Sequence, residues 1–232
     1  MSHSKHRPDI ELTDAEAAQK IFAEDMRRIL SPRSVVLDVG ANRGQFASEL
    51  LEVESISKIY CFEPVPDAFA YLEALAAADS RILPVQAAVS TETSKIPFFV
   101  TKSDVGSSML RPISGQPSQW LTLEEEIMVE AIRLDEFIQN EIGDHLQAID
   151  LLKSDAQGAD KLVLESAGNE LSPNRIRSVL VEVNFSEFYA SQDRYTEILE
   201  LLDRRGYRPA RIYPHRAHDD WLWWADILFI GK

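Results

Sequence analysis

The stretch Leu37-Asp38-Val39-Gly40-Ala41-Asn42-Arg43-Gly44 decides the fold class of this 232-residue chain. It follows the apolar run 34–39, which is typical of a buried strand, and it opens a predicted helix over 44–53. Gly40 permits a tight turn after the strand, and Gly44 permits close packing where the helix begins. A turn of this kind lies at the carboxyl edge of a sheet, where open α/β proteins bind ligands.

Strands and helices alternate on both sides of this stretch. Further strands are predicted over 58–62, 81–89, 148–153 and 178–183, and helices over 66–78, 158–167 and 195–205. The last two predicted strands, 207–213 and 226–230, have no helix between them, so they are expected to pair antiparallel. The pattern predicts an α/β fold: a sheet of about seven strands, mostly parallel, with a C-terminal antiparallel pair and helices on both faces.

The chain is expected to divide into an N-terminal tail and helix, residues 1–33, and one domain, residues 34–232. The helix is predicted over 10–30, with Thr13 as its cap and Glu16 in a capping box. Within the domain, an irregular insertion over about 95–133 contains strands over 96–101 and 125–133 and a loop rich in Gly, Ser and Pro. A helix over 134–142 follows it. Such an insertion suits substrate contacts.

Composition restricts the partners and the location. The formal net charge of −14 opposes binding to nucleic acid, so no nucleic-acid partner is expected. No apolar run approaches the length of a membrane span, and no signal peptide is apparent, so the expected location is cytoplasmic. The single cysteine, Cys61, lies in an apolar strand pattern and is expected to be a buried structural thiol. The oligomeric state stays open, and the sequence is compatible with a homodimer.

The residues after the first two strands indicate which ligand the turn holds. Asn42 stands where a dinucleotide site needs a glycine, and the Asp38 carboxylate would repel a pyrophosphate but attract the ammonium of S-adenosylmethionine (SAM). Glu63 ends the second strand, 23 positions after Gly40, where an acidic side chain accepts hydrogen bonds from ribose hydroxyls. SAM is therefore favoured over NAD. Ala87 and Ala88 suit an adenine ring, with plain core packing an equally weighted interpretation.

Six segments, in order along the chain, carry a family resemblance. They are Asp38–Gly44 (DVGANRG), Phe62–Pro66 (FEPVP), Gly106–Leu110 (GSSML), Leu134–Phe137 (LDEF), Leu152–Gly158 (LKSDAQG) and Gly206-Tyr207. This set resembles the FkbM-type methyltransferases, from about Val35 to the C-terminus. The resemblance implies a class I methyltransferase (Rossmann-like) fold, SAM as cofactor, and methylation of a hydroxyl on a sugar, a polyketide or another secondary metabolite. Ser154 and Asp160 depart from the family, which usually has an aliphatic residue and Glu there.

These observations define a set of candidate site residues. The expected cofactor contacts are Asp38, Gly40, Asn42, Gly44, Phe46, Glu63, Pro64, Ala87, Ala88 and Asp155. An alcohol must lose a proton when it is methylated, so Asp155 is the candidate base, with Lys153 or Glu182 tuning it. A plain Lys153–Glu182 ion pair is an equally weighted alternative.

The sequence also offers candidate acceptor contacts and candidate metal ligands. Ser107, Ser108 and Trp120 are the candidate contacts to a small hydroxylated acceptor. No metal site is predicted, because His215 and His218 do not have a recognised ligand spacing.

Three other functions remain open. One is a ribose 2′-O-methyltransferase acting on RNA, which the Lys153, Asp155 and Glu182 set partly matches, although a second lysine is not evident and the charge is acidic. Another is a non-catalytic SAM-binding partner protein. The third is an NAD-dependent oxidoreductase, which Asn42 and the terminal antiparallel pair oppose.

Overall fold

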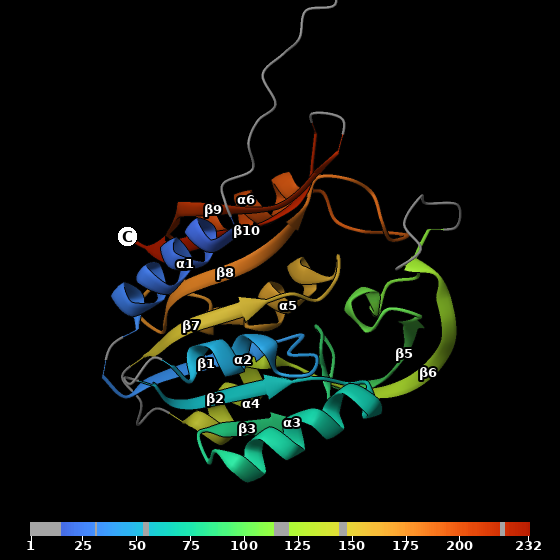
Figure 1. The fold of residues 1–232 in the computed structure, drawn as a ribbon, viewed down its shortest axis with the longest axis horizontal. Helices are drawn as coiled ribbons and strands as arrows, with labels where there is room; N and C mark the ends of the chain where they lie inside the picture. Colours follow the sequence, from blue (N-terminus) through green and yellow to red (C-terminus); the bar gives the residue numbers. More distant parts are fainter. Residues whose placement is uncertain (1–14, 31, 53–55, 114–120, 144–147, 219–220) are drawn as a thin grey trace, which may run out of the picture.

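A seven-stranded sheet forms the centre of the molecule. The computed structural model describes residues 15–30, 32–52, 56–113, 121–143, 148–218 and 221–232. The strand order is β3-β2-β1-β7-β8-β10-β9 (Figure 1). The strands are β1 (Ser34–Val39), β2 (Ile56–Phe62), β3 (Ile82–Val85), β7 (Ile149–Ser154), β8 (Ile176–Asn184), β9 (Tyr207–His218) and β10 (Trp221–Gly231). The pairs from β3 to β8 are parallel, and β10 is antiparallel to both β8 and β9. The predicted architecture is confirmed.

Helices cover both faces of this sheet. Successive residues of a strand point to opposite faces, and the apolar side chains on each face pack against a different set of helices. Val36, Ile59 and Cys61 belong to one core cluster, together with residues of α1 (Ala15–Ile29), α2 (Gln45–Leu50) and α3 (Pro66–Ala78). Leu37 and Val39 belong to the other, with residues of α4 (Leu134–Phe137), α5 (Asp160–Ser166) and α6 (Tyr195–Arg204). The Cys61 thiol is fully buried, as expected, and burial raises its pKa.

The predicted insertion pairs with two residues that precede it to form a second, smaller sheet of β4 (Ala88–Val89), β5 (Ser94–Thr101) and β6 (Leu123–Ile132), in the order β4-β6-β5. The single strand predicted over 81–89 is therefore wrong. β3 pairs with β2 only as far as Phe62↔Val85, and Ala88 and Val89 instead pair in parallel with β6. The chain changes partner because β2 ends there, and backbone groups beyond Val85 need another strand to satisfy them.

Two predicted helices differ in detail from those observed. The helix predicted over 134–142 is the short α4, followed by a π-helical turn (Ile138–Ile142) that ends at Gly143. The N-terminal helix α1 is described from Ala15, so the predicted Thr13 cap lies outside the described residues. Asp25 fastens α1 to β9: its carboxylate accepts hydrogen bonds from Arg211 Nε (2.9 Å) and Tyr213 Oη (2.7 Å).

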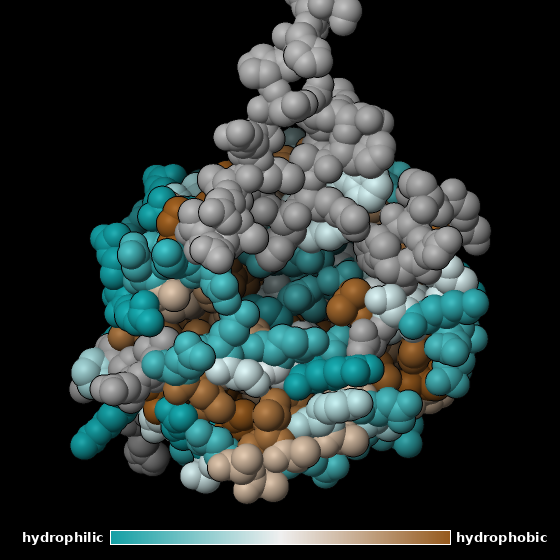
Figure 2. Space-filling model, in the orientation of Figure 1, coloured by the Kyte–Doolittle hydropathy of each residue, from teal (hydrophilic) through white to brown (hydrophobic). Residues whose placement is uncertain are grey.

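The strand directions determine where a ligand site forms. In Figure 1 the arrows of β1, β2 and β7 all point towards the small sheet, so their carboxyl ends face β5 and β6. On the face that carries α1, α2 and α3, hydrophilic side chains predominate and the hydrophobic areas are small and separated (Figure 2). Within the described ranges, no helix is long and apolar enough to cross a membrane.

Candidate active site

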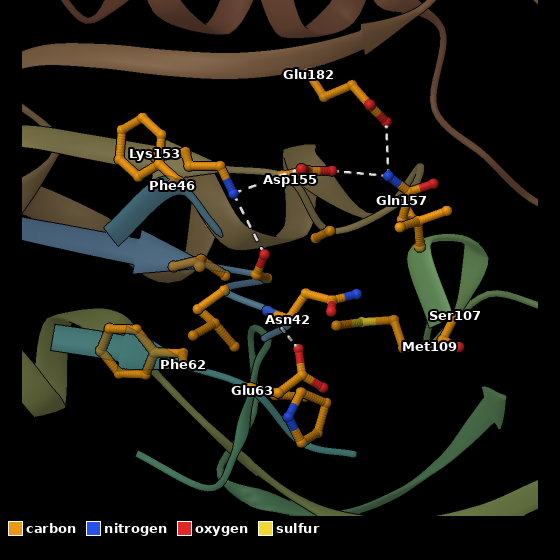
Figure 3. A pocket seen from close by; sticks show the side chains of 18 of the residues that line it. Asn42, Phe46, Phe62, Glu63, Ser107, Met109, Lys153, Asp155, Gln157 and Glu182 are labelled. Atoms are coloured by element: carbon orange, nitrogen blue, oxygen red, sulfur yellow. Dashed lines mark hydrogen bonds and ion pairs between the residues drawn. The ribbon is translucent and has the colours of Figure 1, made fainter. Parts of the chain in front are cut away.

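The carboxyl ends of β1, β2, β7 and β8 surround a cavity of about 550 Å³ (Figure 3). The small sheet and the 104–109 segment close its other side. Predicted site residues that line it are Gly40, Asn42, Phe46, Glu63, Pro64, Ala87, Ala88, Ser107, Lys153, Asp155 and Glu182. The structure thus brings together residues from six separate segments of the chain.

The turn after β1 is packed directly against the loop after β7. Gly40 has φ +73°, and a Cβ atom there would lie 2.0 Å from the carbonyl oxygen of Asp155. The Asp155 N–H donates to the Val39 carbonyl across the same contact (3.1 Å). Gly44 has φ +83° and leaves room for the Leu75 side chain of α3. Both glycines therefore have the roles expected of them, a turn and a close approach. Gly44 shapes the cavity from behind its wall.

Glu63 is buried at the end of β2 with both carboxylate oxygens held. Oε2 accepts a hydrogen bond from the Asn42 N–H (2.9 Å), and Oε1 accepts one from the Val65 N–H (2.8 Å). Burial raises the pKa of Glu63 to about 7, although these two N–H groups oppose the shift. A carboxylate oxygen accepts about two hydrogen bonds, so each retains capacity for one more donor. Two such oxygens at the cavity wall suit a pair of vicinal hydroxyls.

Asp38 is fully buried, and among the described residues it forms an ion pair with Lys153, whose Nζ lies 3.0 Å from Oδ1. Neither Asp38 oxygen accepts a hydrogen bond from the described part of the chain. Burial raises the pKa of Asp38, and the Lys153 ammonium opposes that shift. Asp38 does not line the cavity, but its charge acts on two groups that do: it forms the ion pair with Lys153, and it adds to the raised pKa of Glu63.

Lys153 joins three segments of the site. Besides Asp38, its ammonium lies 3.3 Å from the Gly40 carbonyl and 3.5 Å from Asp155 Oδ2, with the Phe46 ring 5.4 Å away. Burial alone would lower the pKa of Lys153, but the two carboxylates outweigh it and hold that pKa above its usual value. The alternative of a Lys153–Glu182 ion pair is wrong. Lys153 is in register with Asp38 on β1. On β8 the residue in register with Lys153 is Leu180, and Glu182 lies two residues further along that strand.

Glu182 is bound instead through Gln157, a residue that the sequence interpretation did not select. Gln157 Nε2 donates to Asp155 Oδ1 (2.7 Å) and to Glu182 Oε1 (3.0 Å), as the dashed lines in Figure 3 show. Its Oε1 lies 3.0 Å from the Tyr189 hydroxyl. Burial raises the pKa of Glu182 well above its usual value, and the nearby Asp155 and Asp226 carboxylates add to this effect. Gln157 lies inside the LKSDAQG motif, which could have indicated it; Tyr189 had no local pattern.

The three candidate acceptor residues do not share one location. Ser107 lines the cavity, and its Oγ accepts a hydrogen bond from the Thr101 N–H (3.1 Å). Ser108 is fully buried outside the cavity lining, where its Oγ donates to the Gln157 carbonyl (2.8 Å). Trp120 lies outside the described residues. Ser108 therefore connects the insertion to the loop after β7.

The two departures from the family pattern lie in contact. The Ser154 hydroxyl donates to Asp160 Oδ1 (2.6 Å), and the same oxygen accepts the Ala156 N–H (3.0 Å). Both side chains are buried, and burial raises the pKa of Asp160 to about 6. A buried carboxylate needs such donors. Ser154 supplies one, so Asp160 and Ser154 are compatible as a pair where the family usually has Glu and an aliphatic residue.

The strand order with one reversed strand, and the acidic residues at the ends of β1 and β2, define a class I methyltransferase fold. The family described as "Methyltransferase FkbM domain" matches residues 38–209, which is most of the chain. The chain belongs to this family. The predicted family is thereby confirmed, and so is the prediction of S-adenosylmethionine as the cofactor.

Individual relatives agree with this assignment. The chain is 30% identical over 192 residues to the 2-O-methyltransferase NoeI of Sinorhizobium fredii (strain NBRC 101917 / NGR234), covering 79% of this chain and 76% of that protein. A solved FkbM methyltransferase from Methylobacillus flagellatus KT matches with a TM-score of 0.51 at 15% identity, over 84% of this chain but 43% of that one. A precorrin-6y C5,15-methyltransferase from Geobacter metallireducens GS-15 matches with a TM-score of 0.50 at 10% identity, over 100% and 96% of the two chains. The two structures support the fold alone.

Proposed function

We propose that this protein transfers a methyl group from SAM to a hydroxyl of a small metabolite, such as a sugar or a polyketide-type natural product. The observation that carries the proposal is that one cavity holds both Glu63, suited to a diol, and the carboxylates of Asp155 and Glu182, suited to receive a proton. The 2-O-methyltransferase relative supports oxygen as the methylated atom.

The residues present fit the cofactor. The two Glu63 oxygens each have hydrogen-bonding capacity left for a ribose hydroxyl, and a cavity of about 550 Å³ lies in the usual size range for small-molecule sites. When bound, SAM supplies an electrophilic methyl group on a sulfonium. The proposed contacts are those predicted from the sequence that line the cavity: Gly40, Asn42, Phe46, Glu63, Pro64, Ala87, Ala88 and Asp155. Asp38 and Gly44 are proposed to support these contacts from behind the wall.

The chain's own part in the reaction is to take up a proton and to position the acceptor. A neutral alcohol is a weak nucleophile, and it must lose its proton as its oxygen becomes bonded to carbon. Asp155 is proposed as the group that receives this proton, with Glu182 beside it. Lys153 holds Asp155 Oδ2 in place, so the carboxylate is oriented before an acceptor arrives.

The insertion is proposed to provide the acceptor contacts. Val105, Ser107 and Met109 line the cavity from the 104–109 segment, and Trp224 lines it from β10. Ser107 is the polar member of this group. Residues 34–232 are proposed to act as one methyltransferase domain that includes the insertion, with residues 1–33 as an added tail and helix.

Calorimetric titration with S-adenosylhomocysteine (SAH) tests the cofactor part of the proposal. The wild type is expected to bind SAH with micromolar affinity and Glu63→Ala to bind more weakly, with circular dichroism showing that both are folded. A folded wild type that does not bind SAH would contradict the proposal. Transfer of a radiolabelled methyl group to a panel of sugars and polyketide alcohols then tests the acceptor class. Full activity in Asp155→Asn would contradict the assignment of the proton acceptor.

A further inference from the structure

Gln157 has a backbone conformation that its side-chain type does not favour. Its φ of 52° lies in the left-handed region, which non-glycine residues seldom adopt. Three hydrogen bonds hold the turn in place: the Asp160 carboxylate accepts from the Ala156 and Gly158 N–H groups, and the Ser108 hydroxyl donates to the Gln157 carbonyl. A strained residue that its surroundings fix so firmly is a candidate for a functional role.

The strained backbone places the Gln157 amide between two carboxylates. A primary amide has two N–H donors, and the Nε2 of Gln157 lies within hydrogen-bond distance of Asp155 (2.7 Å) and of Glu182 (3.0 Å). Exchanging the amide oxygen and nitrogen would place an acceptor against two further acceptors. The Tyr189 hydroxyl lies 3.0 Å from Oε1 and 3.0 Å from the Gly106 carbonyl oxygen, so the two carboxylates alone fix the orientation of the amide.

Glu182 lies among other acidic groups, so a hydrogen-bond donor beside it has a large effect on its charge. The neighbouring strand β10 places Asp226 in register with Glu182, the β7 end contributes Asp155 and Lys153, and Asp160 lies on α5. Four of these five groups are acidic when Glu182 itself is counted. The Lys153 ammonium is directed at Asp38, the Gly40 carbonyl and Asp155. Within the described residues, Gln157 supplies the one hydrogen bond that Glu182 accepts.

We propose that Gln157 is a positioning residue that holds the carboxyl groups of Asp155 and Glu182 side by side, each bonded to its amide, at the acceptor end of the cavity. This rests on the proposed function, because it concerns the carboxylates that would receive the acceptor's proton. Hydrogen bonds donated to a carboxylate favour its charged form, and two close carboxylates without them tend to retain a proton between them. Gln157 thus favours the deprotonated form of Glu182, against burial and the neighbouring carboxylates, which favour the protonated form.

A titration of the two carboxyl groups by ¹³C NMR tests this without a known acceptor. Two variants remove the amide in different ways: Gln157→Leu keeps most of the side-chain volume, and Gln157→Gly relieves the left-handed backbone, so it is the safer variant for folding. Asp155→Asn and Glu182→Gln assign the resonances. Gln192→Leu is the matched control, because within the described part of the chain the Gln192 amide donates to the Ser186 carbonyl and accepts from the Phe188 N–H, and it does not bond Asp155 or Glu182.

Both Gln157 variants are expected to raise the titration midpoint of Glu182 by about one pH unit, because each variant loses the hydrogen-bond donor that favours the charged form of this carboxyl group. Gln192→Leu is expected to leave it unchanged. An unchanged midpoint in folded Gln157→Gly would overturn the proposal. Calorimetry with SAH separates this test from the test of the proposed function. The Gln157 variants should bind SAH with an affinity within about twofold of the wild type. A folded wild type that fails to bind SAH would contradict the proposed function instead.

Discussion

Lys153 and Asp38 form a buried ion pair between neighbouring parallel strands, with Nζ 3.0 Å from Oδ1 and the two residues in register. The pair connects the strand that precedes the glycine turn to the strand that presents Asp155. Burying two charges costs free energy that their attraction repays only when both are present. The positions of the glycine turn and of Asp155 therefore both depend on this ion pair.

Removing one member of the pair should destabilise the protein strongly. Lys153→Met leaves the Asp38 carboxylate buried without its counter-charge, and we expect a loss of about 3–5 kcal/mol in the free energy of unfolding. The loss should be larger at pH 8 than at pH 5, because an unpaired Asp38 can protonate at the lower pH. Urea denaturation measures both values. The double variant Lys153→Met/Asp38→Asn should be closer to wild type than Lys153→Met; an equal or greater loss would contradict the pairing.

The affinity for SAH should depend on pH through Glu63. Its pKa of about 7 means that the free site is partly protonated near neutrality, whereas ribose hydroxyls donate to the charged carboxylate. Binding should therefore release protons, and the affinity should rise between pH 6 and pH 8. Calorimetry in buffers of different ionisation enthalpy measures the released protons. Glu63→Gln should abolish this dependence, and Glu49→Gln, which changes an exposed carboxylate on α2, should retain it.

The raised pKa of Glu63 should also make the free energy of unfolding fall as the pH rises. The pKa of Glu63 in the folded chain lies above its ordinary value of 4.5, so the folded state binds more protons than the unfolded state between these pH values. Its contribution is complete below about pH 4.5 and is lost as the pH passes 7, a change of roughly 3 kcal/mol for this group. Chemical denaturation across this range should show a smaller decline in Glu63→Gln than in wild type. Equal declines would contradict the raised pKa.

Gly40 and Gly206 form a matched pair for testing the turn. Both have positive φ, +73° and +92°, so an alanine at either position adopts a strained backbone, at a cost of about 1–2 kcal/mol. Only Gly40→Ala also places a methyl group 2.0 Å from a backbone oxygen, whereas the nearest atom at Gly206 is 3.4 Å away. We expect Gly40→Ala to lose more stability than Gly206→Ala, together with SAH binding. Equal losses in urea denaturation would contradict the close approach.

Asp25 should fix the N-terminal helix to the sheet. Burial opposes its ionisation, but hydrogen bonds from Arg211 and Tyr213 outweigh burial and lower its pKa, so its contribution is present near neutral pH and is lost as the pH falls. Asp25→Asn should lose roughly 1–3 kcal/mol, as for hydrogen bonds to a charged group. Asp203→Asn, which breaks the exposed pair with Arg208, is the control and should lose less than about 1 kcal/mol. Similar losses would contradict this role.

The sequence predicted those parts of the molecule that local patterns determine. The apolar run 34–39 became β1 with the same bounds, and the helix predicted over 66–78 became α3. Glu63 was selected from its distance to Gly40, and both line one cavity because parallel strands end at the same edge. These inferences needed only neighbouring residues and one general rule of topology.

Features that depend on distant contacts were not predicted. The division of 81–89 into β3 and β4 follows from pairing with β6, more than 40 residues later, and nothing in the sequence around Gln86 indicates it. Ser108 was assigned to the acceptor, but its contact with the Gln157 carbonyl lies 49 positions away. The partner of Lys153 depends on strand register, which the apolar pattern of buried parallel strands specifies weakly.

The two-residue strand β4 has a consequence for protein engineering. Ala88 lines the cavity, yet its backbone partner is Ala131 of β6. A chimaera that exchanges residues 95–133 for those of a relative would replace the strand with which this part of the cavity lining is paired. Residues 95–133 therefore cannot be exchanged to change the acceptor without also disturbing the cavity lining at Ala88. Swapped segments would need to begin before Ala87, or new specificities would have to be reached by point substitutions within the 104–109 segment.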